Sequence, residues 1–300
     1  MLRGTLYLAT MTGVIVVIGV VINIICALLG IQLAQAQLTT ILIISAVAGF
    51  AGSIISLLLS KSLCKRSQHV QVITTPRSEA EQWLVQTVAK LAKAKGVDMP
   101  EVGIYPAAEA NAFATGWNKN AALVAVSSGI LKSMNRRQLE AVLGHEMSHV
   151  SNGDMVTQTL IQGIVNTFVY ALSYILAAVA SSALSGGRSS DDRSSSGGGL
   201  GNMMVYYMIN SVLQALFGFL GSLVCLWFSR WREYRADAGS AECCGKEAMI
   251  SALQVLGGLT PASDKTASMQ ALCINGSFNL SELFSTHPTI EKRIAALRAL

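Results

Sequence analysis

The chain has 300 residues, of which 52% are hydrophobic and only 13% are charged, and its mean hydropathy is positive at +0.48. Soluble domains usually have about 25% charged residues, so this composition excludes an ordinary soluble protein and places much of the chain in lipid. The net charge of +5 comes from Lys and Arg beside apolar segments and indicates no nucleic-acid partner.

Asp, Glu, Lys and Arg are absent from three long segments, which are residues 4–60, 155–187 and 194–229. A helix needs about 20 apolar residues to cross about 30 Å of hydrocarbon, so the first segment accommodates two crossings and each of the others one. In the second crossing, Ser45, Gly49 and Ser53 recur every four residues and predict a helix-packing face. We therefore expect four transmembrane helices, near residues 6–30, 40–60, 159–183 and 201–228.

Basic residues follow the second and fourth predicted spans, whereas the turn at 32–40 between the first two has no charge; these residues are Lys61, Lys65, Arg66, Arg230, Arg232 and Arg235. The positive-inside rule then places both termini in the cytoplasm. An alternative is that Ala34-Gln35-Ala36 is a signal-peptide cleavage site. The preceding apolar run of about 25 residues exceeds the roughly 7 to 15 of a signal core and favours a membrane span.

Two charged segments, 61–154 and 230–300, lie on the same membrane side in this topology and can form one split cytoplasmic domain. They are separated by residues 155–229, which hold two spans joined by a Gly/Ser-rich loop at about 185–200, expected outside the cytoplasm. The first two spans occupy residues 1–60. The six cysteines form no C-x-x-C pair or regular framework and are expected to be cytosolic free thiols.

The first charged segment predicts a helix followed by a small sheet. Ser78 and Glu81 form a capping-box sequence at the start of an amphipathic helix that is expected to end at Gly96. The next residues are rich in β-formers separated by Pro, Gly and Asn, and predict short strands at Val102–Tyr105, Asn111–Thr115 and Ala122–Val126. The fold class is therefore predicted as an α+β membrane protein, mostly helical with a small sheet.

A second helix of this segment is predicted to begin after Asn135 and to end near Asn152-Gly153, and it carries the sequence His145-Glu-Met-Ser-His149. The four-residue interval places both imidazoles on one helix face, where they suit one tetrahedral zinc. Glu146 can then act on a metal-bound water as general base rather than as a ligand. The alternative is a surface helix with two solvated histidines, but the whole chain has only four.

A catalytic zinc of this kind needs a third protein ligand, for which Glu233 is the candidate. It follows the fourth span, on the same predicted side as His145, and begins the one-turn pair Glu233-x-x-x-Asp237. Asp237 is expected to accept a hydrogen bond from the free ring nitrogen of a ligand histidine. In the alternative, Glu233 only pairs with the neighbouring Arg230 or Arg232.

Three motifs together resemble the HtpX heat-shock membrane peptidases over essentially the whole chain: His145-Glu-Met-Ser-His149-x-x-Asn-Gly-Asp154, Glu233-Tyr-Arg-Ala-Asp237-Ala-Gly-Ser-Ala241 and Asn111-Ala-Phe-Ala-Thr-Gly116. This group is related to the CAAX prenyl peptidases and to soluble gluzincins. The resemblance implies a gluzincin-like zinc peptidase domain in a bacterial inner-membrane protein. It also implies a role in stress response and protein quality control, through degradation of damaged or surplus membrane proteins.

The resemblance implies two further site assignments. Asn111 and Ala112 match an edge strand that binds the substrate backbone by strand addition, although Asn111 also suits an ordinary turn. His287 matches a histidine that stabilises the tetrahedral oxyanion, but Pro288 suits the first position of the last helix, so His287 has an alternative role as its cap.

We therefore expect a membrane-bound zinc endopeptidase with one Zn²⁺ per chain, whose partners are the bilayer and unfolded or membrane-protein substrates. One alternative is a prenyl-protein peptidase, for which four spans are too few to enclose a chamber. Another is a catalytically silent membrane adaptor or chaperone, against which the intact Glu146 argues. A transporter is disfavoured because the predicted spans contain no Asp, Glu, Lys or Arg.

Overall fold

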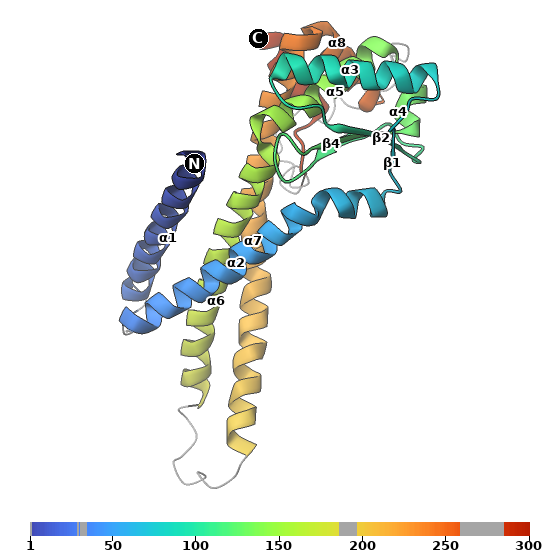
Figure 1. Ribbon diagram of the computed structural model, residues 1–300. Helices are drawn as coiled ribbons and strands as arrows, with labels where there is room; N and C mark the ends of the chain where they lie inside the picture. Colours follow the sequence, from blue (N-terminus) through green and yellow to red (C-terminus); the bar gives the residue numbers. More distant parts are fainter. Residues whose placement is uncertain (1, 29, 31–34, 186–196, 259–284) are drawn as a thin grey trace. The chain divides into compact units, whose positions relative to one another are not determined.

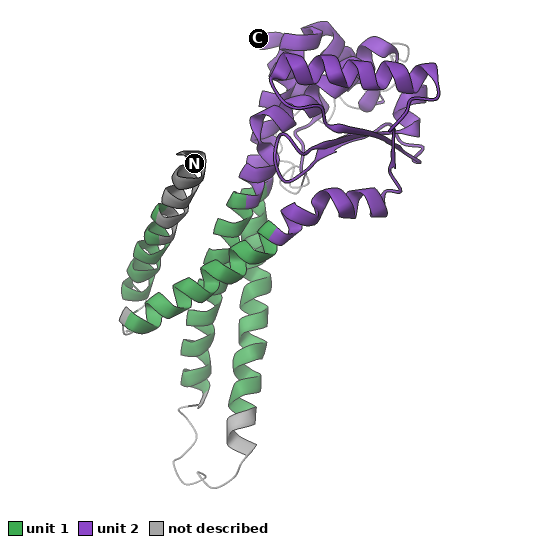
Figure 2. Ribbon diagram, in the orientation of Figure 1, with its two compact units in different colours: residues 1–54, 160–225 green, residues 55–159, 226–300 purple. Residues whose placement is uncertain are grey.

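The computed structural model describes residues 2–28, 30, 35–185, 197–258 and 285–300. Most of the predicted Gly/Ser-rich loop, at 186–196, and residues 31–34 of the predicted turn lie outside the described residues. Contacts group the chain into two compact units, coloured separately in Figure 2. Unit 1 comprises residues 1–54 and 160–225, and unit 2 comprises residues 55–159 and 226–300.

The described chain is mostly helical with one small mixed sheet (Figure 1). Among the described residues, three helical stretches are long and apolar enough to cross a membrane: Ala36–Ser67, Asp154–Leu184 and Gly201–Cys244. They belong to α2 (Gln35–Ser67), α6 (Asp154–Ser185) and α7 (Gly197–Cys244). The apolar stretch in α1 (Leu2–Leu28) is Val16–Leu28, which is shorter than these three. The first predicted span, near residues 6–30, therefore stays a prediction.

The predicted small-residue face of α2 packs against α6 within unit 1. Ser45 and Ser53 are buried, and a Cβ added to Gly49 would lie 2.8 Å from the backbone nitrogen of Thr167. A larger side chain at Gly49 would push the two helices apart. The four-residue spacing therefore predicted this contact correctly.

The sheet of unit 2 has the order β1-β2-β4-β3. The parallel pair of β2 (Glu101–Tyr105) and β4 (Leu123–Ser127) forms its centre, and β3 (Ala112–Thr115) pairs antiparallel with β4 at one edge. The three predicted strands are confirmed to within one residue at each end. The other edge strand, β1 (Gln71–Val72), was not predicted because its two residues are too few for an alternating pattern.

The first helix of unit 2, α3 (Glu79–Lys95), begins and ends where its sequence predicts. The Ser78 side chain accepts a hydrogen bond from the Glu81 backbone, and Gly96 closes the helix in the left-handed conformation at φ +64°. Of the two hydrogen bonds that the predicted capping box requires, the one to the Glu81 carboxylate has a different donor. The Glu81 carboxylate accepts from the backbone N–H of Arg77, at 2.6 Å, rather than from that of Ser78.

The central helix of unit 2 is α5 (Arg136–Asn152), which carries the H-E-x-x-H sequence. Asn135 and Gln138 form the complete capping box at its start, and Gly153, at φ +71°, ends it as predicted. It packs against α3, against β3 and β4, and against α8 (Lys246–Leu256). Leu143 and Met147 are fully buried, and each such side chain stabilises the fold by about 1.5 to 3 kcal/mol.

Two shorter helices complete the described part of unit 2. One is α4 (Ser128–Ser133), which follows β4 directly and starts at the side-chain cap Ser127. The other is α11 (Ile290–Ala299), capped by Thr289 and packed against α8. In this position α11 brings Arg293 next to Asp237 of α7 and His145 of α5.

Candidate metal centre

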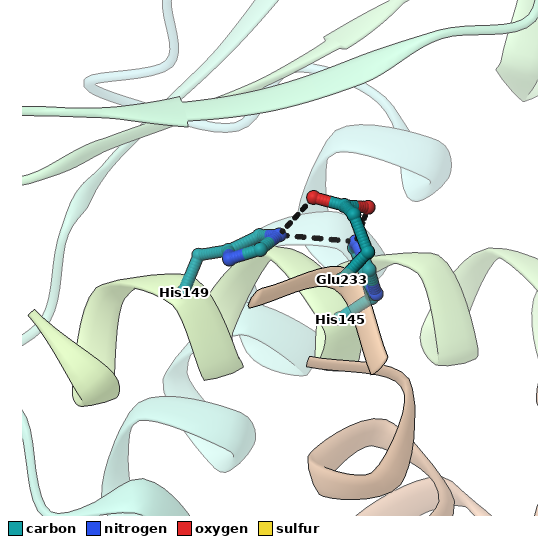
Figure 3. Close-up of side chains that lie close together, drawn as sticks. All are labelled: His145, His149 and Glu233. Atoms are coloured by element: carbon teal, nitrogen blue, oxygen red, sulfur yellow. Dashed lines mark hydrogen bonds and ion pairs between the residues drawn. The ribbon is translucent and has the colours of Figure 1, made fainter. Parts of the chain in front are cut away.

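His145 and His149 on α5 and Glu233 on α7 point toward one another (Figure 3). The Nε2 atoms of the two histidines lie 3.2 Å apart. One Glu233 oxygen, Oε2, lies 3.4 Å from His145 Nε2, and the other, Oε1, lies 3.3 Å from His149 Nε2. The one-turn spacing of the histidines therefore produces the shared face that their sequence predicts.

The dimensions of this triangle suit a small tetrahedral cation. With bonds of about 2.0 to 2.1 Å to nitrogen and oxygen, such an ion requires neighbouring ligand atoms about 3.3 to 3.4 Å apart. In addition, Glu233 Oε2 is buried without a hydrogen-bond partner. A buried carboxylate oxygen without a partner is costly, and a cation at the centre of the triangle would compensate for it. The donor set of two imidazoles and a carboxylate fits Zn²⁺.

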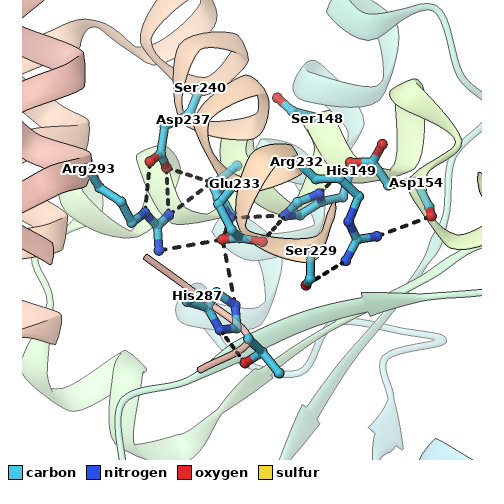
Figure 4. A network of polar contacts seen from close by, with 12 residues as sticks. Ser148, His149, Asp154, Ser229, Arg232, Glu233, Asp237, Ser240, His287 and Arg293 are labelled. Atoms are coloured by element: carbon cyan, nitrogen blue, oxygen red, sulfur yellow. Dashed lines mark hydrogen bonds and ion pairs between the residues drawn. The ribbon is translucent and has the colours of Figure 1, made fainter. Parts of the chain in front are cut away.

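Each histidine is oriented by a carboxylate on the side of its ring that faces away from the triangle, and Figure 4 labels these two carboxylates, Asp154 and Asp237. His145 Nδ1 lies 2.9 Å from Asp237 Oδ1, and His149 Nδ1 lies 2.7 Å from Asp154 Oδ2. A proton on Nδ1, donated to the carboxylate, leaves the lone pair on Nε2 directed into the triangle. Asp237 thus lies beside the ring nitrogen of His145 that faces away from the triangle, which is the kind of contact that we expected from the sequence. Asp154 has the equivalent position beside His149.

Arg293 of α11 connects the carboxylates on the His145 side. Its Nε and one terminal nitrogen donate to the two oxygens of Asp237, at 2.8 and 2.6 Å. The other terminal nitrogen lies 3.5 Å from Glu233 Oε2. Arg293 is 7% exposed and Asp237 is 2% exposed, so the pair is shielded from water and its fork geometry is fixed.

The carboxylates and imidazoles shift one another's protonation. Burial would raise the pKa of Glu233, but the interactions with His145 and His149 outweigh it and hold that pKa well below its ordinary value. Burial would likewise lower the pKa of His149, whereas Asp154 and Glu233 raise it to about 10. The pKa of His145 is also raised, since Asp237 and Glu233 outweigh its burial. A metal ion entering the triangle must therefore displace protons from the imidazoles.

Glu146 faces a cavity of about 170 Å³ beside the triangle, whose lining includes Asn111, Ala112, His145, Glu146, His287 and Arg293. Burial raises the pKa of Glu146, and the charges of His145 and His149 only partly offset this effect. His287 Nε2 lies 3.6 Å from Glu233 Oε2, and its Nδ1 contacts the Thr286 hydroxyl at 2.8 Å. Of the site residues that the sequence predicts, five line this cavity, namely Asn111, Ala112, His145, Glu146 and His287, and the other three, His149, Glu233 and Asp237, contact His145.

Three alternative interpretations of the sequence are wrong. His145 is only 6% exposed, so the H-E-x-x-H helix is not a surface helix with solvated histidines. Glu233 contacts the histidines and Arg293, whereas Arg232 donates to the carbonyl of Asp154. The cap of the last helix is Thr289, whose hydroxyl accepts from the Lys292 backbone, so His287 does not cap it.

The sequence interpretation missed the site roles of Asp154 and Arg293. Asp154 is the first residue of α6, directly after the glycine that ends α5, and this position returns its side chain toward His149. Arg293 lies on the buried face of α11 with Ile290 and Leu297. A charge within such an apolar stripe requires a buried partner, and this signal is readable from sequence.

Residues 78–300 match peptidase family M48. The chain belongs to this family. It is 53% identical over 299 residues to "Protease HtpX" of Aeromonas hydrophila, covering 99% of this chain and 100% of that protein. It is also 48% identical over 300 residues to "Protease HtpX" of Cronobacter sakazakii, covering 100% of this chain and 98% of that protein.

Among solved structures, this chain matches Ste24p of S. mikatae with a TM-score of 0.61 and 18% identity. The match covers 85% of this chain and 58% of Ste24p. Because the sequence identity is low, the match concerns the fold alone. The resemblance inferred from the motifs is confirmed by the family and by the HtpX relatives. With its long apolar helices, the chain is a membrane-bound metallopeptidase.

Proposed function

We propose that this metallopeptidase is a zinc-dependent endopeptidase that degrades misfolded or surplus membrane proteins at the cytoplasmic face of the inner membrane. The observation that carries the proposal is the triangle of His145, His149 and Glu233 beside Glu146, in a cavity that reaches the edge strand β3. The residues proposed as metal ligands, general base and substrate-binding edge thus lie around one cavity, and this proximity supports the proposal of peptide hydrolysis.

In this proposal one Zn²⁺ per chain is held by His145, His149 and Glu233, with Asp237 and Asp154 orienting the two rings. When bound, zinc lowers the pKa of a coordinated water towards about 7 and polarises the scissile carbonyl. Three protein ligands leave one position for that water, which is the pattern of catalytic rather than structural zinc sites.

Glu146 acts as the general base and then as the general acid. Its raised pKa brings the carboxylate closer to the range in which it both accepts a proton from the attacking water and returns it to the leaving amine. Glu146 lines the cavity and does not belong to the ligand triangle, and its carboxylate accepts a hydrogen bond from the backbone of Ala114, which helps to hold it beside the site.

His287 is proposed to stabilise the oxygen that becomes negative in the transition state. The His287 side chain is 59% exposed, and partial desolvation by its neighbours lowers its pKa, which favours the neutral ring at pH 7. In the tautomer in which Nδ1 accepts from the Thr286 hydroxyl, 2.8 Å away, the ring proton is on Nε2, which lies 3.6 Å from Glu233 Oε2 at the wall of the cavity. A donor so placed can bind the oxyanion without competing with the zinc ligands.

Asn111 and Ala112 are proposed to bind the substrate backbone. Ser127 holds the segment in place, since its hydroxyl accepts from the Asn111 N–H at 3.0 Å and its own N–H donates to the Asn111 carbonyl at 2.9 Å. β3 is an edge strand of the described sheet, with β4 on its other side. An extended substrate can add to this edge by main-chain hydrogen bonds, which tolerate many sequences.

The proposed topology has four spans, near 6–30, 40–60, 159–183 and 201–228, with both termini and the active site in the cytoplasm. Residues 61–154 and 230–300 form the peptidase domain, and residues 1–60 and 155–229 form the spans. Glu233 lies only four positions after Ser229, the last residue before the basic segment that begins at Arg230. The active site is therefore proposed to lie near the inner membrane interface, where membrane-proximal segments of other proteins are within reach.

The proposed function is tested by comparing detergent-purified protein with its Glu146→Gln variant. Gln keeps the shape of Glu but cannot accept the proton, so the variant should bind zinc normally while casein hydrolysis falls by about 100- to 10,000-fold. Glu140→Gln on the same helix is the matched control, because Glu140 pairs with Lys90 instead of lining the cavity. Parental activity in Glu146→Gln would show that Glu146 is not the base.

The membrane-proximal preference has a separate test in liposomes. The same flexible cleavable segment is placed either directly after a model transmembrane helix or beyond a folded, protease-resistant spacer domain. The first substrate should be cut faster, because its segment is held at the depth of the active site. Equal rates for the two substrates would contradict a site restricted to the membrane surface.

A further inference from the structure

Two adjacent thiols that the proposed mechanism does not use lie at the C-terminal end of α7. Cys243 Sγ and Cys244 Sγ are 3.3 Å apart, and both residues are half-buried. Four other cysteines occur at positions 26, 64, 225 and 273. Among the described thiols, this pair alone combines such proximity with a position against the helix that carries His145 and His149.

The thiol pair packs directly on the backbone of α5 at Gly144, the residue before His145. A Cβ added to Gly144 would lie 2.7 Å from Cys244 Sγ and 3.1 Å from Cys243 Sγ. Cys244 Sγ also donates to the carbonyl of Glu140 at 3.4 Å, and the Ser240 hydroxyl donates to that of Ala141 at 2.6 Å. The sulfur atoms therefore cannot move without changing the contact between α7 and α5.

The two thiols differ in their readiness to ionise. The contact with the Cys244 thiol lowers the pKa of Cys243 to about 7, burial opposes this, and the charge of Lys95 assists it. Lys95 is fixed near the thiols because its ammonium donates to the carbonyl of Gly239 at 2.6 Å. The pKa of Cys244 is raised instead. Because Cys244 directs its proton to the Glu140 carbonyl and the Lys95 ammonium is held nearby, Cys243 is assigned as the nucleophilic member of the pair.

We infer that Cys243 and Cys244 form a peroxide-sensitive modification site, at which oxidation to a disulfide displaces the zinc-ligand helix α5. In the first step the Cys243 thiolate attacks one oxygen of hydrogen peroxide. An S–O bond forms, the O–O bond breaks, and hydroxide leaves and takes up a proton. In the second step the Cys244 thiol attacks the sulfenic sulfur, an S–S bond forms, and the S–O bond breaks with release of water. The two sulfurs lose two electrons in total and the peroxide is reduced to water.

Forming this disulfide requires movement at the end of α7. An S–S bond of about 2.05 Å brings the two sulfurs more than about 1 Å closer. Adjacent Cα atoms are about 3.8 Å apart, below the usual range of about 4.4 to 6.8 Å for bridged cysteines, so the last helical turn must deform. Gly245, at φ +94°, follows the pair and lets the backbone turn there. A strained disulfide of this kind is readily reduced, which suits a reversible modification.

The chemical part of the inference is tested by mass spectrometry after brief treatment with hydrogen peroxide. Trypsin releases residues 236–246, which contain both thiols and no other cysteine. This peptide should lose two hydrogen masses in the parent protein and regain them with dithiothreitol. In Cys244→Ser the sulfenic acid of Cys243 should instead be trapped by dimedone. A peptide that remains a dithiol while the peroxide is consumed would overturn the inference.

The coupling to α5 is tested by hydrogen exchange and by peptide hydrolysis. Oxidation should accelerate exchange over residues 139–149 and slow casein hydrolysis by about 100-fold, the loss expected from a displacement of about 1 Å. Cys243→Ala/Cys244→Ala should show neither response and should keep its basal activity. Cys64→Ser, which removes a half-buried thiol elsewhere, should respond like the parent.

The effect on hydrolysis rests on the proposed function, whereas the disulfide and the exchange measurement do not. Protein that cleaves no substrate but still forms the disulfide and shows faster α5 exchange would refute the proposed function and support the modification site. Disulfide formation with unchanged exchange over 139–149 would overturn the coupling. Equal inactivation of the double-alanine variant by peroxide would overturn it as well.

Discussion

His145 and His149 lie one turn apart on α5, yet the carboxylates that orient them come from different parts of the chain. Asp154 reaches His149 from only five residues away, across the turn that ends α5. Asp237 reaches His145 from α7, and Arg293 of α11 fixes Asp237 in turn. One half of the site is thus specified locally, and the other half depends on the packing of α7 and α11 against α5.

The largest effect is expected from Glu233→Ala, because Glu233 contacts both histidines and supplies the only proposed ligand outside α5. The variant should retain no zinc after dialysis and should not hydrolyse casein. Metal analysis of the purified protein measures this directly. Glu242→Ala is the matched control, since Glu242 is exposed on the same helix. Stoichiometric zinc in Glu233→Ala would remove this residue from the ligand set.

A smaller loss is expected on the distant side from Asp237→Asn. The neutral amide accepts a weaker hydrogen bond from His145 than the carboxylate does. It also leaves the buried Arg293 without its counter-charge. Zinc affinity should fall by nearly 100-fold, the upper end of the usual range for such partners. Competition with a chelator of known affinity gives the ratio of zinc affinities. A change below tenfold would show that His145 does not need this carboxylate.

On the local side, Asp154→Asn should weaken zinc binding by about tenfold, the lower end of the same range. Asp154 touches His149 at 2.7 Å, but within the described part of the chain its side chain has no arginine partner comparable to Arg293. The substitution therefore leaves no buried guanidinium uncompensated. The same chelator competition applies, and a larger loss than in Asp237→Asn would reverse the proposed difference between the two sides.

The smallest change in zinc affinity, below about tenfold, is expected from Arg293→Lys. Lysine keeps the positive charge but cannot make the two-pronged contact with Asp237, so one charge-assisted hydrogen bond is lost. The free energy of unfolding in detergent should fall by about 1.5 to 3 kcal/mol. Arg298→Lys on the exposed face of α11 should leave it unchanged. Equal stability of the two variants would show that Arg293 does not hold α11 in place.

The sequence predicted the local half of the molecule well, because each signal is contained in a few adjacent residues. Asn135 with Gln138 and the final Gly153 set the limits of α5, and the spacing of its histidines set their common face. The three central strands followed from runs of β-formers between breaks. Glu233 was also predicted from a local signal, because it lies in the first charged turn after the fourth predicted span.

What the sequence left open depends on long-range packing. Nothing near Arg293 in the chain shows that its guanidinium meets Asp237, because the contact joins residues 56 positions apart. Asp154 was recognised as part of a motif, but its contact with His149 depends on how α6 starts after Gly153. The two-residue strand β1 exists only because β2 offers it a partner.

The most direct test of the account is X-ray absorption spectroscopy at the zinc edge of the zinc-loaded protein. Two imidazoles and oxygen ligands at about 2.0 to 2.1 Å are predicted, with no sulfur at about 2.3 Å. The signal of one imidazole alone, or any sulfur scattering from the cysteines of α7, would contradict a site made of His145, His149 and Glu233.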